Sequence, residues 1–205
     1  MQADYSVELG RDDPALEVPW TSDDARLRYY DLKADPSLIS RIAEVSGLPE
    51  FRDFLLRMNA PGFPLQTAKC DAWSSRDISA EEQVFAAPQK FVSYVDLFFV
   101  APGSRLNFNA HEEFVKDLCA LLARAPELPA SIECVLRHCH YHSEGNHLEE
   151  SGDDSDLGFA ITIYVSGFGD SDEECRRRWL IALRLLQNAL VQLSSHIDRT
   201  RARPN

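Results

Sequence analysis

The sequence predicts an α+β fold with a ferredoxin-like βαββαβ order, extended by a further strand and a long C-terminal helix, and with an antiparallel sheet. Segments of alternating apolar residues are interleaved with segments in which apolar residues recur every three to four positions. Residues 90–100 are apolar on both faces of a strand, which is typical of the centre of a sheet. A chain of 205 residues is long enough for one α+β domain spanning residues 1–205.

The first part of the chain is predicted to contain strands and a kinked pair of helices. Residues 1–25 are expected to be largely irregular, with a short strand at 5–9, because prolines and aspartates interrupt any longer pattern. Asp35 followed by Pro36 is typical of a helix start, and Gly47 is typical of a helix end. The predicted elements here are strand 26–32, a helix pair within 36–59, and strand 65–73, one face of which carries small residues such as Ala68 and Cys70.

The second part is predicted to supply most of the sheet and two helices. Asn109 with Glu112 resembles a capping box, so a helix is expected from there to Leu122. The final helix carries an apolar stripe that suits either a coiled-coil seam or packing on the sheet, and its additional apolar residues favour packing. The predicted elements are strands 90–100, 131–142 and 157–165 and helix 171–198, followed by a frayed tail at 199–205.

Charge and composition limit the classes of partner. The formal net charge is −12, and a surface of that sign repels phosphate backbones, so nucleic-acid binding is not expected. No apolar run approaches the length of a membrane span, and the N-terminal residues show no secretory signal pattern. The 5 cysteines include no C-x-x-C pair, which indicates reduced thiols and a cytoplasmic location. The second face of the sheet leaves room for a homodimer.

A row of histidines at the end of the strand at 131–142 is the candidate metal site. Alternate residues of a strand share a face, so His138, His140 and His142 are expected to point the same way. A straight row cannot easily converge on one metal, so a further ligand from Glu144 or His147 would be needed. Zn, Ni or Cu would suit imidazole ligands. Asp31 and Asp96 would also lie near the histidines if their strands are neighbours in the sheet.

The same histidines have a second interpretation, which we favour. Imidazoles are common at polar strand ends, where one edge packs and the other stays in water, and the strand runs here into an acidic segment at 143–156 that is expected to be a mobile loop. The spacing also lacks the sequence context that makes metal motifs specific.

Two hypotheses about function follow from the sequence. The first is a non-catalytic binding or interaction module with an unidentified protein or small-molecule partner, because no complete catalytic motif is found. The alternative is a metal-dependent enzyme, a hydrolase, in which the histidine row holds a metal-bound water as nucleophile.

Overall fold

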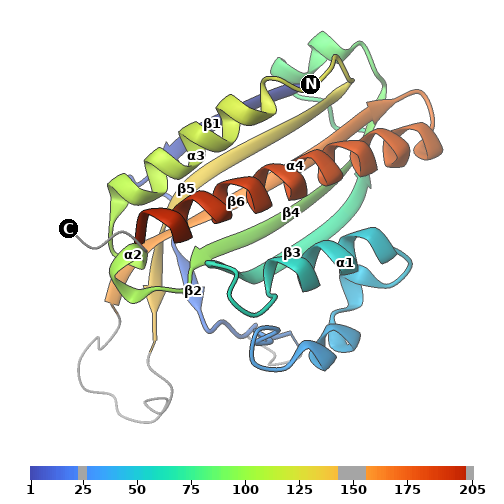
Figure 1. Ribbon diagram of the computed structural model, residues 1–205. Helices are drawn as coiled ribbons and strands as arrows, with labels where there is room; N and C mark the ends of the chain where they lie inside the picture. Colours follow the sequence, from blue (N-terminus) through green and yellow to red (C-terminus); the bar gives the residue numbers. More distant parts are fainter. Residues whose placement is uncertain (23–26, 143–155, 202–205) are drawn as a thin grey trace.

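The computed structural model describes residues 1–22, 27–142 and 156–201, with side chains described as far as Ser194. It shows a mixed α+β fold with one open sheet of 6 strands (Figure 1). The strands are β1 (Gln2–Glu8), β2 (Leu16–Val18), β3 (Leu65–Ser75), β4 (Gln89–Phe99), β5 (Ala130–Tyr141) and β6 (Asp156–Gly169). The α-helices are α1 (Pro49–Met58), α2 (Pro102–Arg105), α3 (Phe108–Leu122) and α4 (Asp172–Arg201), and the 3-10 helices are η1 (Pro36–Arg41), η2 (Ala43–Val45) and η3 (Glu81–Phe85).

The sheet is mixed, so the prediction of an antiparallel sheet is wrong, and the ferredoxin-like order is not confirmed. The strands follow the order β1-β5-β6-β4-β3, with β2 also paired to β5. Strands β3, β4, β6 and β5 are antiparallel neighbours, whereas β1 and β2 both run parallel to β5. Both parallel strands come from the N-terminal segment: β1 overlaps the short strand predicted at 5–9, whereas β2 was not predicted. β1 and β5 are far apart in the sequence: the paired residues Glu8 and Arg137 are separated by 129 positions. A pairing over such a distance leaves no local pattern in the sequence.

The strand predicted at 26–32 is also wrong. Its described residues, 27–32, contribute only an isolated bridge between Thr21 and Arg28. The Asp31 side chain accepts hydrogen bonds from the backbone N–H groups of Lys33 and Ala34, each at 2.9 Å. A carboxylate that binds the following backbone in this way favours a turn over a strand ladder.

The other predicted elements are confirmed to within a few residues. The kinked pair at 36–59 is η1, η2 and α1; Asp35 caps η1, and Gly47 has a positive φ of 78° where the chain turns toward α1. The capping residue of α3 is Asn107 and not Asn109. The final helix runs to Arg201, so the predicted frayed tail is helical at its start and otherwise lies outside the described residues. The acidic loop at 143–156 also lies outside them, except for Asp156.

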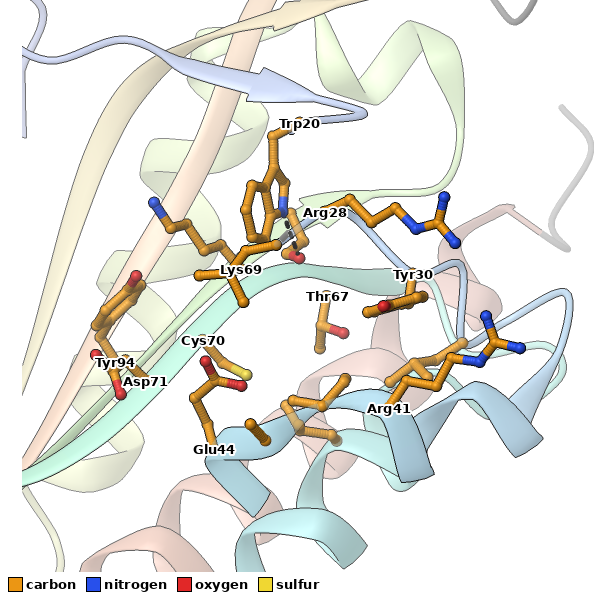
Figure 2. A pocket seen from close by; sticks show the side chains of 16 residues that line it. Trp20, Arg28, Tyr30, Arg41, Glu44, Thr67, Lys69, Cys70, Asp71 and Tyr94 are labelled. Carbon is orange, nitrogen blue, oxygen red and sulfur yellow. Dashed lines mark hydrogen bonds between the residues drawn. The ribbon is translucent and has the colours of Figure 1, made fainter. Parts of the chain in front are cut away.

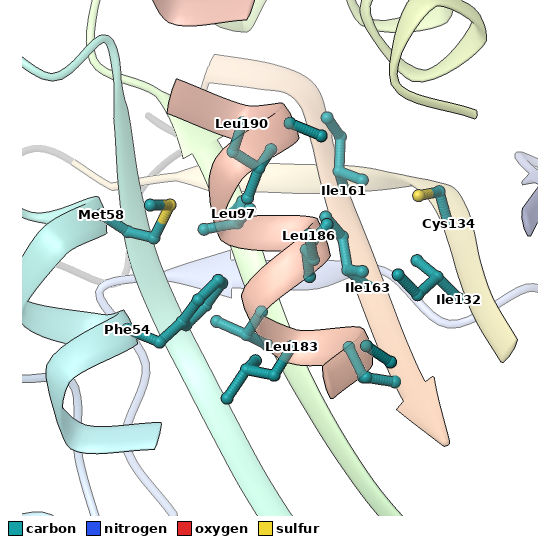
Figure 3. Packing of buried hydrophobic residues seen from close by; sticks show 14 of the residues in the cluster. Phe54, Met58, Leu97, Ile132, Cys134, Ile161, Ile163, Leu183, Leu186 and Leu190 are labelled. Carbon is teal, nitrogen blue, oxygen red and sulfur yellow. The ribbon is translucent and has the colours of Figure 1, made fainter. Parts of the chain in front are cut away.

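The main hydrophobic core lies between the sheet and the helices α1, α3 and α4, which cover one face of it (Figure 1). Figure 3 shows Leu183, Leu186 and Leu190 of α4 above Leu97 of β4 and Ile163 of β6. This contact decides between the two interpretations of the last helix, because its apolar stripe is buried against the sheet. The helix lies directly against Gly167 of β6, where a side chain would overlap the backbone of Cys175 and Trp179.

The central position predicted for strand 90–100 is confirmed. β4 lies between β3 and β6, and its helix-facing residues Phe91, Val95, Leu97 and Phe99 are at most 4% exposed. A smaller cluster on the opposite face contains Val18 of β2, Phe98, Cys139, Tyr141 and Ala160. In the described part of the chain, no helix has the length and apolar character needed to cross a membrane.

Candidate functional site

The three histidines of the predicted metal site lie at the end of β5, and His138 is on the face of the sheet that the helices cover. His138 pairs with Phe159 of β6 and stacks on its ring at 5.6 Å between centroids, and its Nδ1 is buried without a hydrogen-bond partner among the described residues. His140 is half-buried in β5, and His142, just beyond the strand, is exposed and donates its backbone N–H to Val18. The structure thus places the first histidine in an aromatic environment and the last in solvent.

The other proposed metal ligands are not brought to the histidines by the described residues. Glu144 and His147 lie outside the described residues. Asp96 lies on β4 opposite Thr162, on the face away from His138, and Asp31 lies beside β3 at the far side of the sheet from β5. No group of three or more potential ligands suited to a metal ion occurs among the residues described. The metal site therefore stays a prediction.

The structure shows a second candidate site that the sequence did not predict. It is a cavity of about 140 Å³ beside the edge strand β3, bounded by η1, η2 and the segment at 27–32 (Figure 2). Its inner wall is apolar and includes Leu32, Ile42 and Leu55, and aromatic side chains of Trp20, Tyr30 and Tyr94 stand around it. The remaining lining residues are Leu27, Arg28, Arg41, Ala43, Glu44, Thr67, Ala68, Lys69, Cys70 and Asp71.

A β-bulge in β3 shapes one wall of the cavity. The register with β4 shifts between Thr67 and Cys70, so Ala68 and Lys69 are left without a partner in β4. The indole Nε1 of Trp20 donates to the carbonyl oxygen of Ala68 at 3.0 Å, and the ammonium of Lys69 lies over the Trp20 ring, 5.1 Å from its centroid. The bulge thereby holds the Trp20 ring against the edge of the sheet.

The opposite wall is held by the turn at Asp31. Gln66 of β3 donates from its side-chain amide to the Asp31 carboxylate at 2.8 Å. The ammonium of Lys33 donates to the carbonyl oxygens of Ala60 and Phe63, which ties the same segment to the end of α1. Burial lowers the pKa of Lys33, and Asp31 partly offsets this effect. The cavity is therefore bounded by backbone that is fixed on both sides.

The charged side chains stand at the rim of the cavity, where Glu44 is half-buried and the others are exposed. Figure 2 shows Arg28 and Arg41 on one side with Tyr30 between them, and Glu44 and Asp71 toward the other side. Burial, with smaller contributions from Glu44 and Asp71, raises the pKa of the Cys70 thiol to about 12. The Cys70 thiol is therefore protonated near neutral pH, and the thiolate, which is the nucleophilic form, is disfavoured. No histidine lines the cavity among the described residues.

Sequence reasoning missed this cavity because its lining comes from six separate stretches of the chain. The available signal was the run of small side chains at Ala68 and Cys70 of β3, both of which line the cavity. A scan against models of known families finds no match for the chain, and searches of curated proteins and of solved structures find none either. The cavity must therefore be interpreted from its own chemistry.

Asp96 is a buried carboxylate on the face of the sheet opposite the helices, and its burial predicts how stability depends on pH. Asp96 is 3% exposed and accepts a hydrogen bond from Thr162 Oγ1 at 2.6 Å. Burial raises its pKa from 3.8 to about 6, although Thr162, Arg137 and Lys69 act in the opposite direction. The folded state therefore holds a proton on Asp96 in a pH range where the unfolded state has lost it.

We expect the contribution of Asp96 to the free energy of unfolding to fall as the pH rises from about 4 to about 6, and to level off above that range. The ionised form is the one that burial disfavours, and a shift of about two pH units corresponds to about 3 kcal/mol. Asp96→Asn keeps an acceptor for Thr162 and removes the titration, so its unfolding free energy should lack this fall. Urea unfolding at several pH values measures it, with the exposed Asp53→Asn as control. Parallel pH curves for the parent and Asp96→Asn would contradict the prediction.

Proposed function

We propose that the chain is a non-catalytic binding module whose ligand is a small molecule held in the cavity beside β3. The observation that carries this proposal is the cavity itself, which combines an apolar inner wall, aromatic side chains and a charged rim. Ligand sites in proteins commonly combine an apolar lining with a few placed polar groups. A cavity of about 150 Å³ accepts a molecule the size of benzene, so about 140 Å³ suits a small ligand.

The chemistry of the lining supports binding rather than catalysis. Nucleophilic catalysis needs an activated nucleophile with a base in hydrogen-bond reach. The one thiol in the lining, Cys70, is held in its protonated form, and burial together with Asp96 and Asp71 also raises the pKa of the Tyr94 hydroxyl. Both groups are thus kept in their neutral, weakly reactive forms.

We expect small organic molecules from a chemically mixed fragment library to bind the parent protein and to lose binding when the cavity is filled. Ala43 lines the cavity and is exposed, so Ala43→Phe adds a ring at its rim without disturbing the core. Ligand-observed NMR with the full chain measures binding. Val84, which is 65% exposed and does not line the cavity, provides the matched control Val84→Phe.

Fragments that bind the parent and Val84→Phe but not Ala43→Phe would support the proposal. Equal binding of the same fragments to all three proteins would place their site elsewhere and overturn it. A library without any binder would also overturn it, because a preformed apolar cavity of this size accepts small molecules of several kinds.

A further inference from the structure

We infer that the cavity beside β3 binds a free amino acid with an apolar side chain, held as a zwitterion across its rim. This inference rests on the proposed function and specifies its ligand class. It follows from three features of the lining: a cationic side, an acidic side and an apolar interior. Each feature matches one part of such a ligand.

The cationic side matches a carboxylate. Arg28 and Arg41 come from different segments, and their guanidinium groups extend on the same side of the cavity (Figure 2). Neither forms an ion pair with any residue that the structure describes, and Asp35 interacts with Arg41 only at longer range. The planar guanidinium presents paired donors that fit the two oxygens of a carboxylate.

The acidic side matches an ammonium group. Glu44 of η2 is half-buried in the lining, and Figure 2 shows it away from Arg28 and Arg41, on the side of Cys70 and Asp71. Asp71 lies on the same side of the cavity but is exposed. Lys69 also lines the cavity, but it is exposed and its ammonium lies over the Trp20 ring, 5.1 Å from the ring centroid, so Glu44 is the half-buried charge on this side. A ligand that carried only a negative charge would gain nothing from Glu44. A ligand with a carboxylate at one end and an ammonium at the other would satisfy both sides of the rim.

The interior and the overall charge complete the argument. Leu32 and Leu55 are each 1% exposed and, with Ile42, form an apolar wall that suits an aliphatic or aromatic side chain. With about 140 Å³ available, the side chain can be as large as a phenyl ring. The protein carries a net charge of −12, which disfavours the approach of an anion, whereas a zwitterion has no net charge and is not repelled.

Isothermal titration calorimetry of the full chain tests the inference with L-valine, L-leucine, L-methionine and L-phenylalanine as separate probes. We expect at least one of them to bind with a dissociation constant below about 1 mM. The N-acetyl derivative of that amino acid lacks the ammonium, and its amide lacks the carboxylate, so each should bind at least tenfold more weakly. Binding of the N-acetyl derivative as tightly as the free amino acid would overturn the inference.

Variants assign the two ends of the ligand. Arg41→Gln and Glu44→Gln should each weaken binding of the free amino acid at least tenfold, and Arg28→Gln repeats the first test at the second guanidinium. Acetylation should make little further difference in Glu44→Gln, because the two changes remove the same contact. Arg52→Gln is the matched control, since Arg52 is an exposed arginine outside the lining. Unchanged binding in both Arg41→Gln and Glu44→Gln would overturn the inference.

The outcome is separable from that of the proposed function. If none of the four amino acids binds while fragments still bind the parent and are lost in Ala43→Phe, the binding function stands and the zwitterion inference falls. If neither fragments nor amino acids bind, both fall.

Discussion

Replacing Gly167 with alanine is expected to destabilise the protein by more than about 3 kcal/mol, beyond the usual cost of overpacking a core. Gly167 lies in β6 between Phe91 of β4 and Ala130 of β5, so the sheet fixes its position on both sides. A Cβ there would overlap the backbone nitrogen of Trp179 and the carbonyl oxygen of Cys175. Backbone atoms cannot move aside as a flexible side chain can, so α4 would have to lift from the sheet.

The free energy of unfolding in urea measures this effect. Gly103→Ala is the matched control, because Gly103 lies in α2 and an added Cβ would have no atom within 4 Å. Its stability should change by less than about 1 kcal/mol. A Gly167→Ala protein as stable as this control would show that α4 does not rest on β6 as described.

Replacing Phe99 with alanine should cost about 3–5 kcal/mol. The Phe99 side chain is 4% exposed and contacts the rings of His111 and Phe114, with centroid distances of 4.8 and 5.5 Å. Truncation would remove both edge-to-face contacts and leave a cavity between β4 and α3. Thermal or urea unfolding monitored by circular dichroism measures the loss.

Phe99→Leu keeps most of the buried volume and should cost clearly less than Phe99→Ala. Val84→Ala serves as a surface control, because Val84 is 65% exposed and its replacement should change stability by at most about 0.5 kcal/mol. A small effect of Phe99→Ala, comparable to that of Val84→Ala, would contradict the burial of Phe99 against α3.

The elements that the sequence predicted correctly are those with strong local patterns. Strand β4 is apolar on both faces and α4 repeats its apolar residues with helical spacing, so each pattern is complete within the segment itself. The segment at 26–32 had a weak alternation, and there the side chains of Asp31 and Gln66 fix a turn instead. A weak local pattern was thus overridden by a contact with a residue 35 positions away.

The order of the strands and the cavity could not be predicted for a different reason. β1 pairs with β5 because β5 is the edge strand of the antiparallel part of the sheet. The sequence of β1 itself contains no pattern that specifies this partner. The cavity depends on a bulge at Ala68 and on residues that meet only in the folded chain. The histidine row was predicted from spacing alone, and the described residues leave its metal-binding role as a prediction.

The parallel pairing of β1 with β5 has a consequence for synthesis on the ribosome. β1 is translated before the other strands of this sheet, yet its partner among the described residues, β5, begins at Ala130. During translation of the intervening residues, the backbone groups of β1 cannot form their native hydrogen bonds, and the strand remains unpaired. β1 can therefore join the sheet only after β5 has emerged, so the order of assembly of this sheet differs from the order in which its strands are translated.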